Sequence, residues 1–358
     1  MVFVAHGCAQ KRPPVTPAEV GFRMPAEWEP HVATWLAWPR REGISFPGKY
    51  DKIIPIFSEM VHVISSSEDV HINVWDTDLK NDARDALSKH DALNDRVHFH
   101  YFKSLEPWIR DHGPIFVVNE TERAIVNWEY NAWGGKYPPF DIENKIPGQI
   151  AKFRSLQQFK PTIILEGGAI EVNGNGTLLT TESCLLNQNR NPNLSKINIE
   201  KYLCDYLGVT NILWLSEGIK GDDTDGHIDV LARFVDANTI ITVIEDNSDD
   251  DNFHPLQENL RRLKEMRDQD GKPFNIIEIP MPSPVIHEGE RMPASYANFY
   301  ITNNSVLVPT FRNSKDNSAI DTIQSRFPTR KAIGVDSTDL IWGLGSFHCL
   351  TQQEPLLK

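Results

Sequence analysis

Apolar residues follow two different spacings along the chain, and the two spacings alternate. Short apolar or alternating runs predict strands over residues 32–39, 71–76, 97–102, 212–215 and 274–279. Apolar positions three and four residues apart predict amphipathic helices over residues 52–66, 77–90, 194–208 and 255–269. This alternation predicts an α/β fold.

Four further stretches share the pattern of one hairpin: an alternating strand, a turn rich in Asn, Asp or Gly, and a second apolar strand. Their turns begin near Asn119, Asn173, Asp236 and Asn303. These positions are about 55 to 65 residues apart, roughly the length of one ββαβ unit. Because a closed ring leaves no exposed sheet edge, the spacing favours a ring of repeated modules. An ordinary α+β domain with several hairpins is the alternative.

Polar residues stand just before the first strand of each hairpin, namely Asp111, Glu166, His227 with Asp229, and Asn298. In a ring of modules, equivalent positions face the same central axis. We therefore expect these side chains, although far apart in sequence, to lie close together.

Composition narrows the class of protein. The chain has 358 residues, of which 40% are hydrophobic and 24% are charged, and no apolar run approaches the roughly 20 residues that span a bilayer. A formal net charge of −13 disfavours a nucleic-acid partner and favours a small cationic one. The N-terminal segment is a poor secretory signal, because its apolar part is short and its basic residues follow that part, so we expect a cytoplasmic protein.

The cysteines indicate thiol chemistry rather than disulfides. The four cysteines form no CxxC pair, which in an intracellular protein indicates reduced thiols. Cys349 lies in "GSFHCLTQQEP", a polar setting that a buried, purely packed cysteine does not need. Cys184 and Cys204 lie in apolar or helical contexts and are expected to pack, and Cys8 is expected to be incidental.

Three other segments carry candidate catalytic groups. "EPWIRDHGP" (106–114) and "ILEGGAIEV" (164–172) each place a carboxylate before a strand. An Asp beside an Arg, as in the first segment, is also typical of a structural ion pair. A carboxylate before glycines, as in the second, is also typical of a turn. In "GDDTDGHIDVLARF" (221–234), an alternating strand would point His227 and Asp229 to the same side. Asp222 and Asp225 are expected to be solvated loop acids.

Several alternative chemistries lack their motifs. His98 and His100 share one face of a predicted strand, but neither HExxH nor paired CxxC supports a zinc site. No Glu closes an EF-hand loop, and the GxxxxGK[ST] and GxGxxG nucleotide motifs are absent. What is left is a cysteine, a histidine and several acids, and carboxylates suit the paired N–H donors of a guanidinium.

Six segments in order resemble the agmatine deiminases, also called agmatine iminohydrolases. They are "RMPAEWEPHVATWLAWP", "EPWIRDHGP", "LEGGAIEVNGNGTLLTTESCLLNQNRNP", "DTDGHID", "SYANFYITNNSVLVPTF" and "GSFHCLTQQEP". That family belongs to the guanidine-modifying superfamily with the five-bladed α/β-propeller (pentein) fold. The match runs from about residue 20 to residue 355, which implies one domain over residues 1–358 with residues 1–19 as an N-terminal extension.

The resemblance also implies roles for individual residues. Cys349 would be the nucleophile, His227 the general acid and base, and Asp111 and Asp229 the clamps on the guanidinium. The remaining implied substrate-binding residues are Glu166 of the EGG motif, the channel tryptophan Trp108, and Asp223. Many relatives have Glu at the position of Asp223 and a more Gly-rich segment before the His-Cys pair, so these departures bear on substrate preference.

The implied reaction is the hydrolysis of agmatine to N-carbamoylputrescine and ammonia through a covalent cysteine intermediate, as a step in putrescine and polyamine biosynthesis. It needs no metal and no organic cofactor, because the substrate carries its own electrophilic carbon. The alternatives are a deiminase of arginine, methylated arginine or peptidyl-arginine, an amidinotransferase, and a non-catalytic binding module. A homo-oligomer is compatible with the sequence, and we expect no nucleic-acid or membrane partner.

Overall fold

Five sheets with one common strand order make up most of the protein. In the computed structural model, which describes residues 15–357, each of these sheets contains an antiparallel strand pair followed by a parallel neighbour. Residues 1–14 of the expected N-terminal extension, including Cys8, lie outside the described residues. The repeated hairpins predicted from the turn spacing therefore exist, and the mixed α/β class is confirmed.

Four of these sheets have three strands. The first two contain β4 (Ile115–Val118), β5 (Arg123–Val126) and β6 (Gln157–Phe159), and β7 (Glu171–Val172), β8 (Thr177–Thr181) and β9 (Asn211–Leu215). The next two contain β10 (Ala232–Asp236), β11 (Thr239–Ile244) and β12 (Asn275–Pro280), and β15 (Tyr300–Ile301), β16 (Ser305–Thr310) and β17 (Lys331–Asp336). A separate small hairpin is formed by β13 (Ile286–His287) and β14 (Glu290–Arg291).

The fifth sheet joins the two ends of the described chain. Its strands, in spatial order, are β18 (Gln352–Pro355), β1 (His31–Ala37), β2 (Asp69–Asn73) and β3 (Val97–His100). The last strand, β18, pairs antiparallel with the first, β1, in a register that sets His31 opposite Pro355 and Trp35 opposite Gln352. The segment before β18 is thus held beside elements from the start of the chain.

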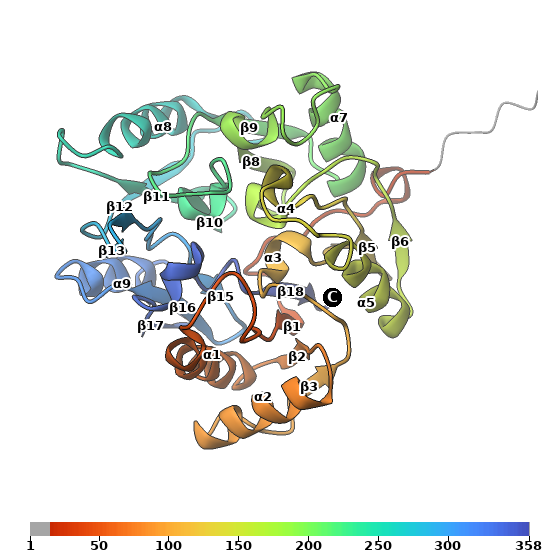
Figure 1. Ribbon diagram of the computed structural model, residues 1–358. Helices are drawn as coiled ribbons and strands as arrows, with labels where there is room; N and C mark the ends of the chain where they lie inside the picture. The colour runs from red at the N-terminus through yellow and green to blue at the C-terminus, as the bar shows by residue number, and fades with distance from the viewer. Residues whose placement is uncertain (1–14, 358) are drawn as a thin grey trace, which may run out of the picture.

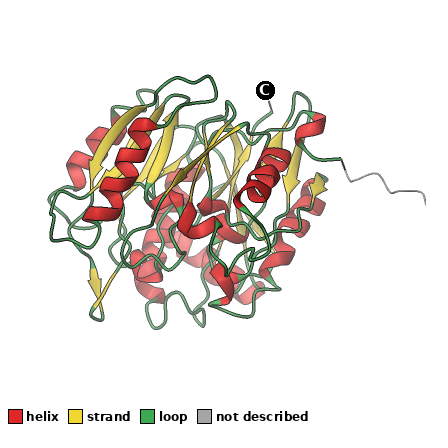
Figure 2. Ribbon diagram, turned by 90° about the horizontal axis from the view of Figure 1, so that it is seen from above, coloured by secondary structure: helices red, strands yellow, loops and turns green. Residues whose placement is uncertain are grey.

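Helices connect the strands and lie mainly toward the outside (Figures 1 and 2). The longer ones are α1 (Tyr50–Ser65), α2 (Thr77–Lys89), α5 (Ile146–Arg154), α7 (Lys196–Leu207), α8 (Phe253–Glu265) and α9 (Asp316–Gln324). The short ones are α3 (Ile109–His112), α4 (Ala132–Gly135) and α6 (Glu182–Leu185). Single 3-10 turns are η1 (Ala18–Val20), η2 (Glu143–Lys145), η3 (Gly167–Ala169), η4 (Ile228–Val230) and η5 (Leu340–Gly343).

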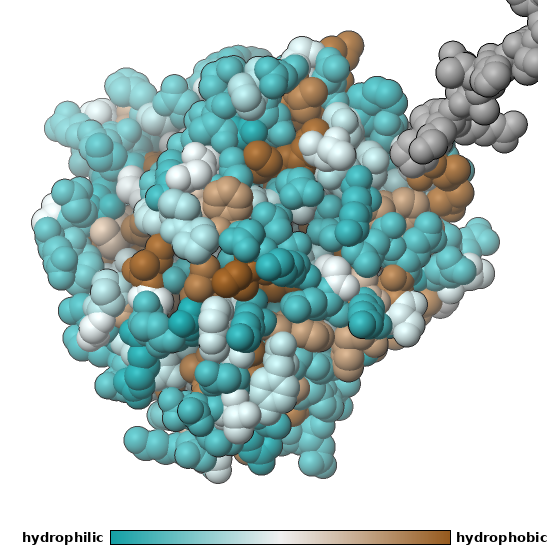
Figure 3. Space-filling view, turned by 45° about the vertical axis from the view of Figure 1, so that its right-hand side comes forward, coloured by the Kyte–Doolittle hydropathy of each residue, from teal (hydrophilic) through white to brown (hydrophobic). Residues whose placement is uncertain are grey.

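Hydrophobic side chains pack between neighbouring sheets as well as under the helices. One cluster joins β10–β12 to β15–β17, and another joins β4–β6 to β7–β9. Because both faces are covered in this way, every residue of β4 and of β8 is buried. The alternating pattern predicted for the first hairpin strand is therefore not matched by alternating burial in β4. Figure 3 shows a mainly hydrophilic surface with apolar residues in small patches.

The predicted helices and strands agree closely with the observed ones. The helices expected over residues 52–66 and 77–90 are α1 and α2. The helix expected over 255–269 is α8, which ends earlier, at Glu265, because Met266 has an extended backbone (φ −65°, ψ 154°). Among the described helices, none combines the length and the apolar character needed to cross a membrane.

Candidate functional site

The candidate catalytic residues occupy one equivalent position in the five sheets, immediately before the first strand. Asp111 lies in α3 ahead of β4, Glu166 precedes η3 and β7, His227 and Asp229 flank the start of η4 ahead of β10, Asn298 precedes β15, and Cys349 precedes β18. The sequence placed the first four in this register, and the structure adds Cys349 as the fifth.

Three of these side chains meet at Gly168. A methyl group built on Gly168 would lie 2.5 Å from His227 Nδ1, 2.7 Å from Asp111 Oδ1 and 3.2 Å from Asp229 Oδ2. The expected convergence of residues from different hairpins is therefore observed. The prediction that His227 and Asp229 lie on a strand was wrong, because the backbone after His227 forms the 3-10 turn η4 and β10 begins only at Ala232.

Asp111 is held by neutral donors. Its Oδ2 accepts from the Trp133 indole N–H at 3.0 Å, and its Oδ1 accepts from the Gly168 backbone N–H at 3.0 Å. Burial raises the pKa of the Asp111 carboxyl to about 6, and nearby Asp229 and Glu166 act in the same direction. The charge of His227 and, to a smaller extent, the Trp133 hydrogen bond oppose this shift because both favour the charged form.

Trp133 reaches Asp111 from an unusual backbone turn. The four residues of α4 all have positive φ, with 52° at Ala132, 53° at Trp133, 92° at Gly134 and 79° at Gly135. Left-handed conformation costs a residue with a side chain roughly 1–2 kcal/mol, and such strain persists only where surrounding contacts fix it. Asn131 provides one such contact, since its side chain accepts from the Gly134 N–H at 2.8 Å.

His227 has no hydrogen-bond partner at either ring nitrogen among the described residues, although its ring is buried. Its Nδ1 lies 3.7 Å from Asp111 Oδ1. Burial lowers the pKa of His227, but Asp111 and the other groups around the ring outweigh burial and raise that pKa well above its ordinary value. The imidazole is therefore held in its protonated form.

The loop before His227 is braced by its acids. Asp222 accepts from the backbone N–H groups of Thr224 and His227 at 2.9 and 3.2 Å. Asp225 accepts from Arg190 Nη1 at 2.6 Å and from Lys136 Nζ at 2.9 Å. The prediction that Asp222 and Asp225 are solvated loop acids was wrong, because both hold the loop that presents His227.

The Cys349 thiol is buried between an acid and an amide. It donates toward Asp229 Oδ2 at 3.5 Å and accepts from Asn298 Nδ2 at 3.2 Å. Burial, followed by the charges of Asp229 and Asp111, raises the pKa of the Cys349 thiol well above its ordinary value. The free site therefore keeps this thiol protonated, and a cation placed beside it would favour the thiolate.

Asp229 is positioned through His348, the residue before the thiol. His348 Nδ1 lies 2.7 Å from Asp229 Oδ2, and His348 Nε2 lies 2.8 Å from Glu27 Oε2. Burial alone would raise the pKa of Asp229, but the hydrogen bond from His348 leaves it below its ordinary value. Glu27 also pairs with Arg110 at 3.3 Å, so the arginine next to Asp111 points away from that acid.

A cavity of about 120 Å³ leads to the thiol, and Cys349, Asp111, Asp223 and Trp108 are among the residues that line it. Trp108 is fixed by donating to Ser45 Oγ at 2.8 Å. A methyl group at Gly345 would lie 2.6 Å from the Trp108 ring and 3.1 Å from Cys349 Cβ, so the glycine lets the indole approach the nucleophile.

Glu166 and Asp223 occupy different depths. Glu166 is fully buried, and its Oε1 accepts from Arg190 Nε at 2.7 Å. Asp223 lies at the cavity and is partly exposed, with Lys136 Nζ 3.4 Å from its Oδ1 and the Tyr137 hydroxyl hydrogen-bonded to it. Asp223 thus lines the cavity, whereas Glu166 lies outside its lining.

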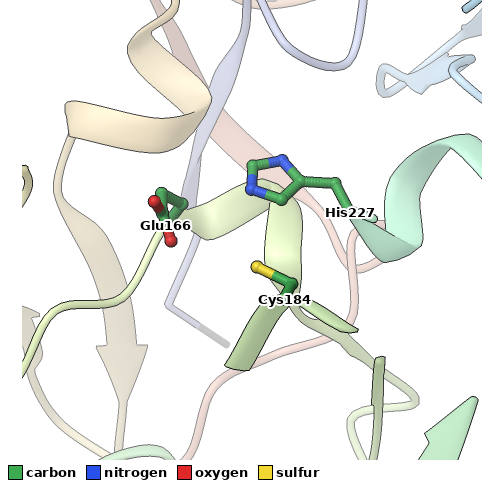
Figure 4. A group of neighbouring side chains, drawn as sticks. All are labelled: Glu166, Cys184 and His227. Carbon is green, nitrogen blue, oxygen red and sulfur yellow. The ribbon is translucent and has the colours of Figure 1, made fainter. Parts of the chain in front are cut away.

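The described residues contain one group with the composition of a metal site, formed by Glu166, Cys184 and His227 (Figure 4). His98 and His100, weighed from the sequence as zinc ligands, do not belong to it. His100 instead packs against His71, with the Nε2 atom of His100 2.8 Å from the Nδ1 atom of His71.

Comparison with known proteins places this geometry in a family. The model of the Porphyromonas-type peptidyl-arginine deiminases matches residues 23–355. The chain belongs to this family. An agmatine deiminase of Pseudomonas aeruginosa is 36% identical, over 96% of this chain and 98% of the relative.

Solved structures of the family have the same fold. The agmatine deiminase of Enterococcus faecalis superposes with a TM-score of 0.90 at 32% identity, covering 98% of this chain and 100% of that one. A C. jejuni agmatine deiminase with a Cys-to-Ser substitution, solved with substrate bound, superposes with a TM-score of 0.85 at 32% identity, covering 93% and 96%. Full-length similarity to named deiminases identifies this member of the family as an enzyme.

Sequence reasoning missed several residues that complete the site of this family member. Trp133 binds Asp111, Arg190 binds Glu166, and Glu27 binds His348, the residue before the thiol. Glu27 and Arg190 stand in segments that resemble the family, but nothing in those segments singles them out, and Trp133 stands in none of the six. The Gly-Gly pair directly after Trp133 was the one available signal, since it indicates an unusual backbone there.

Proposed function

We propose that this enzyme hydrolyses agmatine to N-carbamoylputrescine and ammonia at Cys349. The observation that carries the proposal is a thiol at the end of a small acidic cavity. The lining includes Glu106, Asp111 and Asp223, and no described residue of the lining is Lys, Arg or His. Such a cavity suits a small molecule with a positive charge at each end.

The guanidinium would be held by Asp111 and Asp229. Both carboxylates face the same point beside Gly168, where an added methyl group would lie 2.7 Å from Asp111 Oδ1 and 3.2 Å from Asp229 Oδ2. The Oδ2 atom of Asp229 is also 3.5 Å from the Cys349 sulfur. Carboxylates pair with the N–H donors of a guanidinium. This placement would set the central carbon of the guanidinium beside the sulfur.

In the first half-reaction, the Cys349 thiolate attacks that carbon and forms a tetrahedral adduct. The positive charge of the substrate offsets the carboxylates that keep the thiol protonated, so binding itself promotes ionisation, and the thiol proton is released to solvent. His227, whose raised pKa leaves it protonated, gives a proton to the departing nitrogen. The C–N bond breaks, ammonia leaves, and an amidino group stays bonded to the sulfur.

In the second half-reaction, water attacks the same carbon while the now neutral His227 takes one of its protons. The C–S bond then breaks, the new oxygen becomes the carbonyl of a ureido group, and its remaining proton leaves with the regenerated cysteine. One agmatine and one water thus give one N-carbamoylputrescine and one ammonia. Loss of the carbamoyl group from this product would give putrescine, which supports a role in polyamine biosynthesis.

The contacts of residue Arg110 favour agmatine over free arginine as the substrate. Arg110 is buried and already contacts Glu27, Gln353 and the His348 carbonyl, so it is not available to an α-carboxylate. Asp223, which lines the cavity beside Lys136, would instead attract the distal amine of agmatine.

We also propose that the five sheets are the blades of a five-bladed α/β-propeller, forming one domain. The common strand order and the pairing of β18 with β1 support this arrangement. The cytoplasmic location expected from the N-terminal sequence stays a prediction.

The test compares agmatine, arginine and a peptidyl-arginine as substrates, with mass analysis of the products and ammonia release measured without an added amine acceptor. Agmatine should have the highest kcat/KM and give the ureido product. Cys349→Ser should abolish turnover while keeping the circular dichroism spectrum, because an alcohol ionises far less than a thiol. Cys204→Ser, at a thiol in α7, is the matched control and should stay active. Turnover by Cys349→Ser, or preference for arginine, would contradict the proposal.

A further inference from the structure

Cys184 lies beside two groups of the candidate catalytic site without having a role in the proposed reaction. Its sulfur, a carboxylate oxygen of Glu166 and a ring nitrogen of His227 all lie within 4.8 Å of one another. The three side chains come from different parts of the chain and point toward one another (Figure 4). Their residues are 0%, 0% and 1% exposed, so ordinary solvent-facing acids do not explain the group.

Two of these side chains have unused binding capacity. Arg190 occupies one oxygen of Glu166, but Oε2 has no hydrogen-bond partner among the described residues, and apart from the neighbouring Cys184 thiol the ring nitrogens of His227 have none either. Buried polar atoms are almost always partnered, since leaving one unpaired is costly. The unpaired atoms therefore indicate that a ligand can be accommodated between them.

We propose that Glu166, Cys184 and His227 form a site for Zn²⁺ or a similar borderline-soft divalent cation, and that a cation bound there inhibits the enzyme. A thiolate, an imidazole and a carboxylate are the three ligand types that zinc prefers, and three protein ligands leave a fourth position open. Ca²⁺ and Mg²⁺ require sets of oxygen ligands, which this group does not offer. On binding, a metal–sulfur bond and a metal–nitrogen bond form, and the Cys184 thiol and the His227 imidazolium each release one proton to solvent.

The inhibition rests on the proposed function, whereas the binding does not. A metal bonded to the ring of His227 would replace the proton that the imidazolium gives to the departing nitrogen. The same cation would add positive charge near Asp111, 3.7 Å from the ring, where the guanidinium is expected to bind. Cation and agmatine should therefore oppose each other.

Binding is tested with Co²⁺ in the full-length Cys349→Ser protein, which removes the other buried thiol near the site. A thiolate bonded to Co²⁺ gives a near-ultraviolet charge-transfer band. The band should appear in Cys349→Ser and be lost when Cys184→Ser is added, but it should persist when Cys204→Ser is added instead. Absence of the band, or a band of equal strength in all three proteins, would overturn the site.

Inhibition is tested by titrating Zn²⁺ into the wild-type enzyme and the single variants, each compared with its own metal-free rate. Cys184→Ser should raise the half-inhibitory Zn²⁺ concentration at least tenfold, and Cys204→Ser should leave it unchanged. Raising agmatine should weaken inhibition of the wild type. Equal inhibition of wild type and Cys184→Ser would refute the inhibitory role. If agmatine is not the substrate, the cobalt band would still appear, so failure of the proposed function is distinguishable from failure of the site.

Discussion

Replacing Gly168 by alanine would place a methyl group among the candidate catalytic side chains. The new carbon would lie 2.5 Å from His227 Nδ1 and 2.7 Å from Asp111 Oδ1. Ordinary van der Waals contacts begin at 3.4 Å, so at least one of these groups has to move by roughly 1 Å. Gly168 has no positive φ, and the change therefore acts through side-chain positions rather than through backbone strain.

The expected loss of activity follows from that displacement. A misplacement of about 1 Å at a catalytic group can lower the rate by roughly 100-fold, because the attacking and proton-transferring atoms lose alignment. The same overpacking destabilises a core by about 1–3 kcal/mol. We therefore expect kcat/KM for agmatine to fall about 100-fold in Gly168→Ala, with a small decrease in melting temperature.

The assay measures ammonia release and thermal unfolding for Gly168→Ala and for Gly148→Ala. Gly148 lies in α5, and a methyl group there would find its nearest neighbour, Gln158 Oε1, at 3.5 Å. This control should keep wild-type activity, and its stability should rise by about 0.4–1 kcal/mol, because alanine restricts the unfolded chain.

A folded Gly168→Ala protein with kcat/KM within threefold of wild type would refute the reasoning. Such a result would mean that His227, Asp111 and Asp229 do not have to meet at Gly168 for catalysis. Unfolding of the variant is detected separately by its melting temperature, so a loss of fold would not be mistaken for a loss of alignment.

Three further predictions concern single side chains. Trp133→Phe removes the donor to Asp111 and should lower kcat/KM about tenfold, since a hydrogen bond to a charged group contributes about 1.5–3 kcal/mol. It should also move the acid limb of the pH–rate profile to higher pH, and an unchanged profile would contradict this. Asp229→Asn should lower kcat/KM at least about tenfold by removing a charged acceptor, and wild-type kinetics would count against the clamp. Burial lowers the pKa of His71 to about 3 and that of His100 to about 4. Below about pH 6.5 these histidines bind more protons in the unfolded chain, where their pKa is near 6.5, than in the folded protein. The free energy of unfolding should therefore fall as the pH is lowered from about 6.5 toward 4, and His71→Phe should reduce this fall. Equal pH dependence in wild type and variant would refute the prediction.

The order of helices and strands was predictable because its signals are local. The apolar spacing that predicts α1 and α2 comes from residues within each helix, and the Asn- or Asp-rich turns that mark the hairpins are a few residues long. Burial within the strands was less predictable. Whether β4 is covered on one face or on both depends on neighbouring sheets, which the spacing of residues 115–118 does not report.

The site was predictable where its residues stand in recognisable motifs, and otherwise it was not. Cys349, His227 and Asp111 lie in polar segments beside glycines, which already indicate chemistry. Trp133 reaches Asp111 only because a left-handed turn directs its indole there, and that turn is held by contacts outside the segment. Glu27 acts on His348 from 321 positions away, and no local pattern can predict such a contact.

The charges around the cavity explain why the site would favour a guanidinium. Three other buried acids have a cationic or imidazole partner at hydrogen-bond distance: Arg190 for Glu166, His348 for Asp229, and Arg233 for Glu171. Asp111 instead accepts hydrogen bonds from neutral donors, the protonated ring of His227 lies 3.7 Å away, and burial raises the pKa of the Asp111 carboxyl. A bound guanidinium would add a second positive charge beside Asp111 and donate charged hydrogen bonds to it, and the same charge would favour ionisation of the nearby thiol. One substrate cation would thus complete the electrostatics of the clamp and activate the nucleophile together.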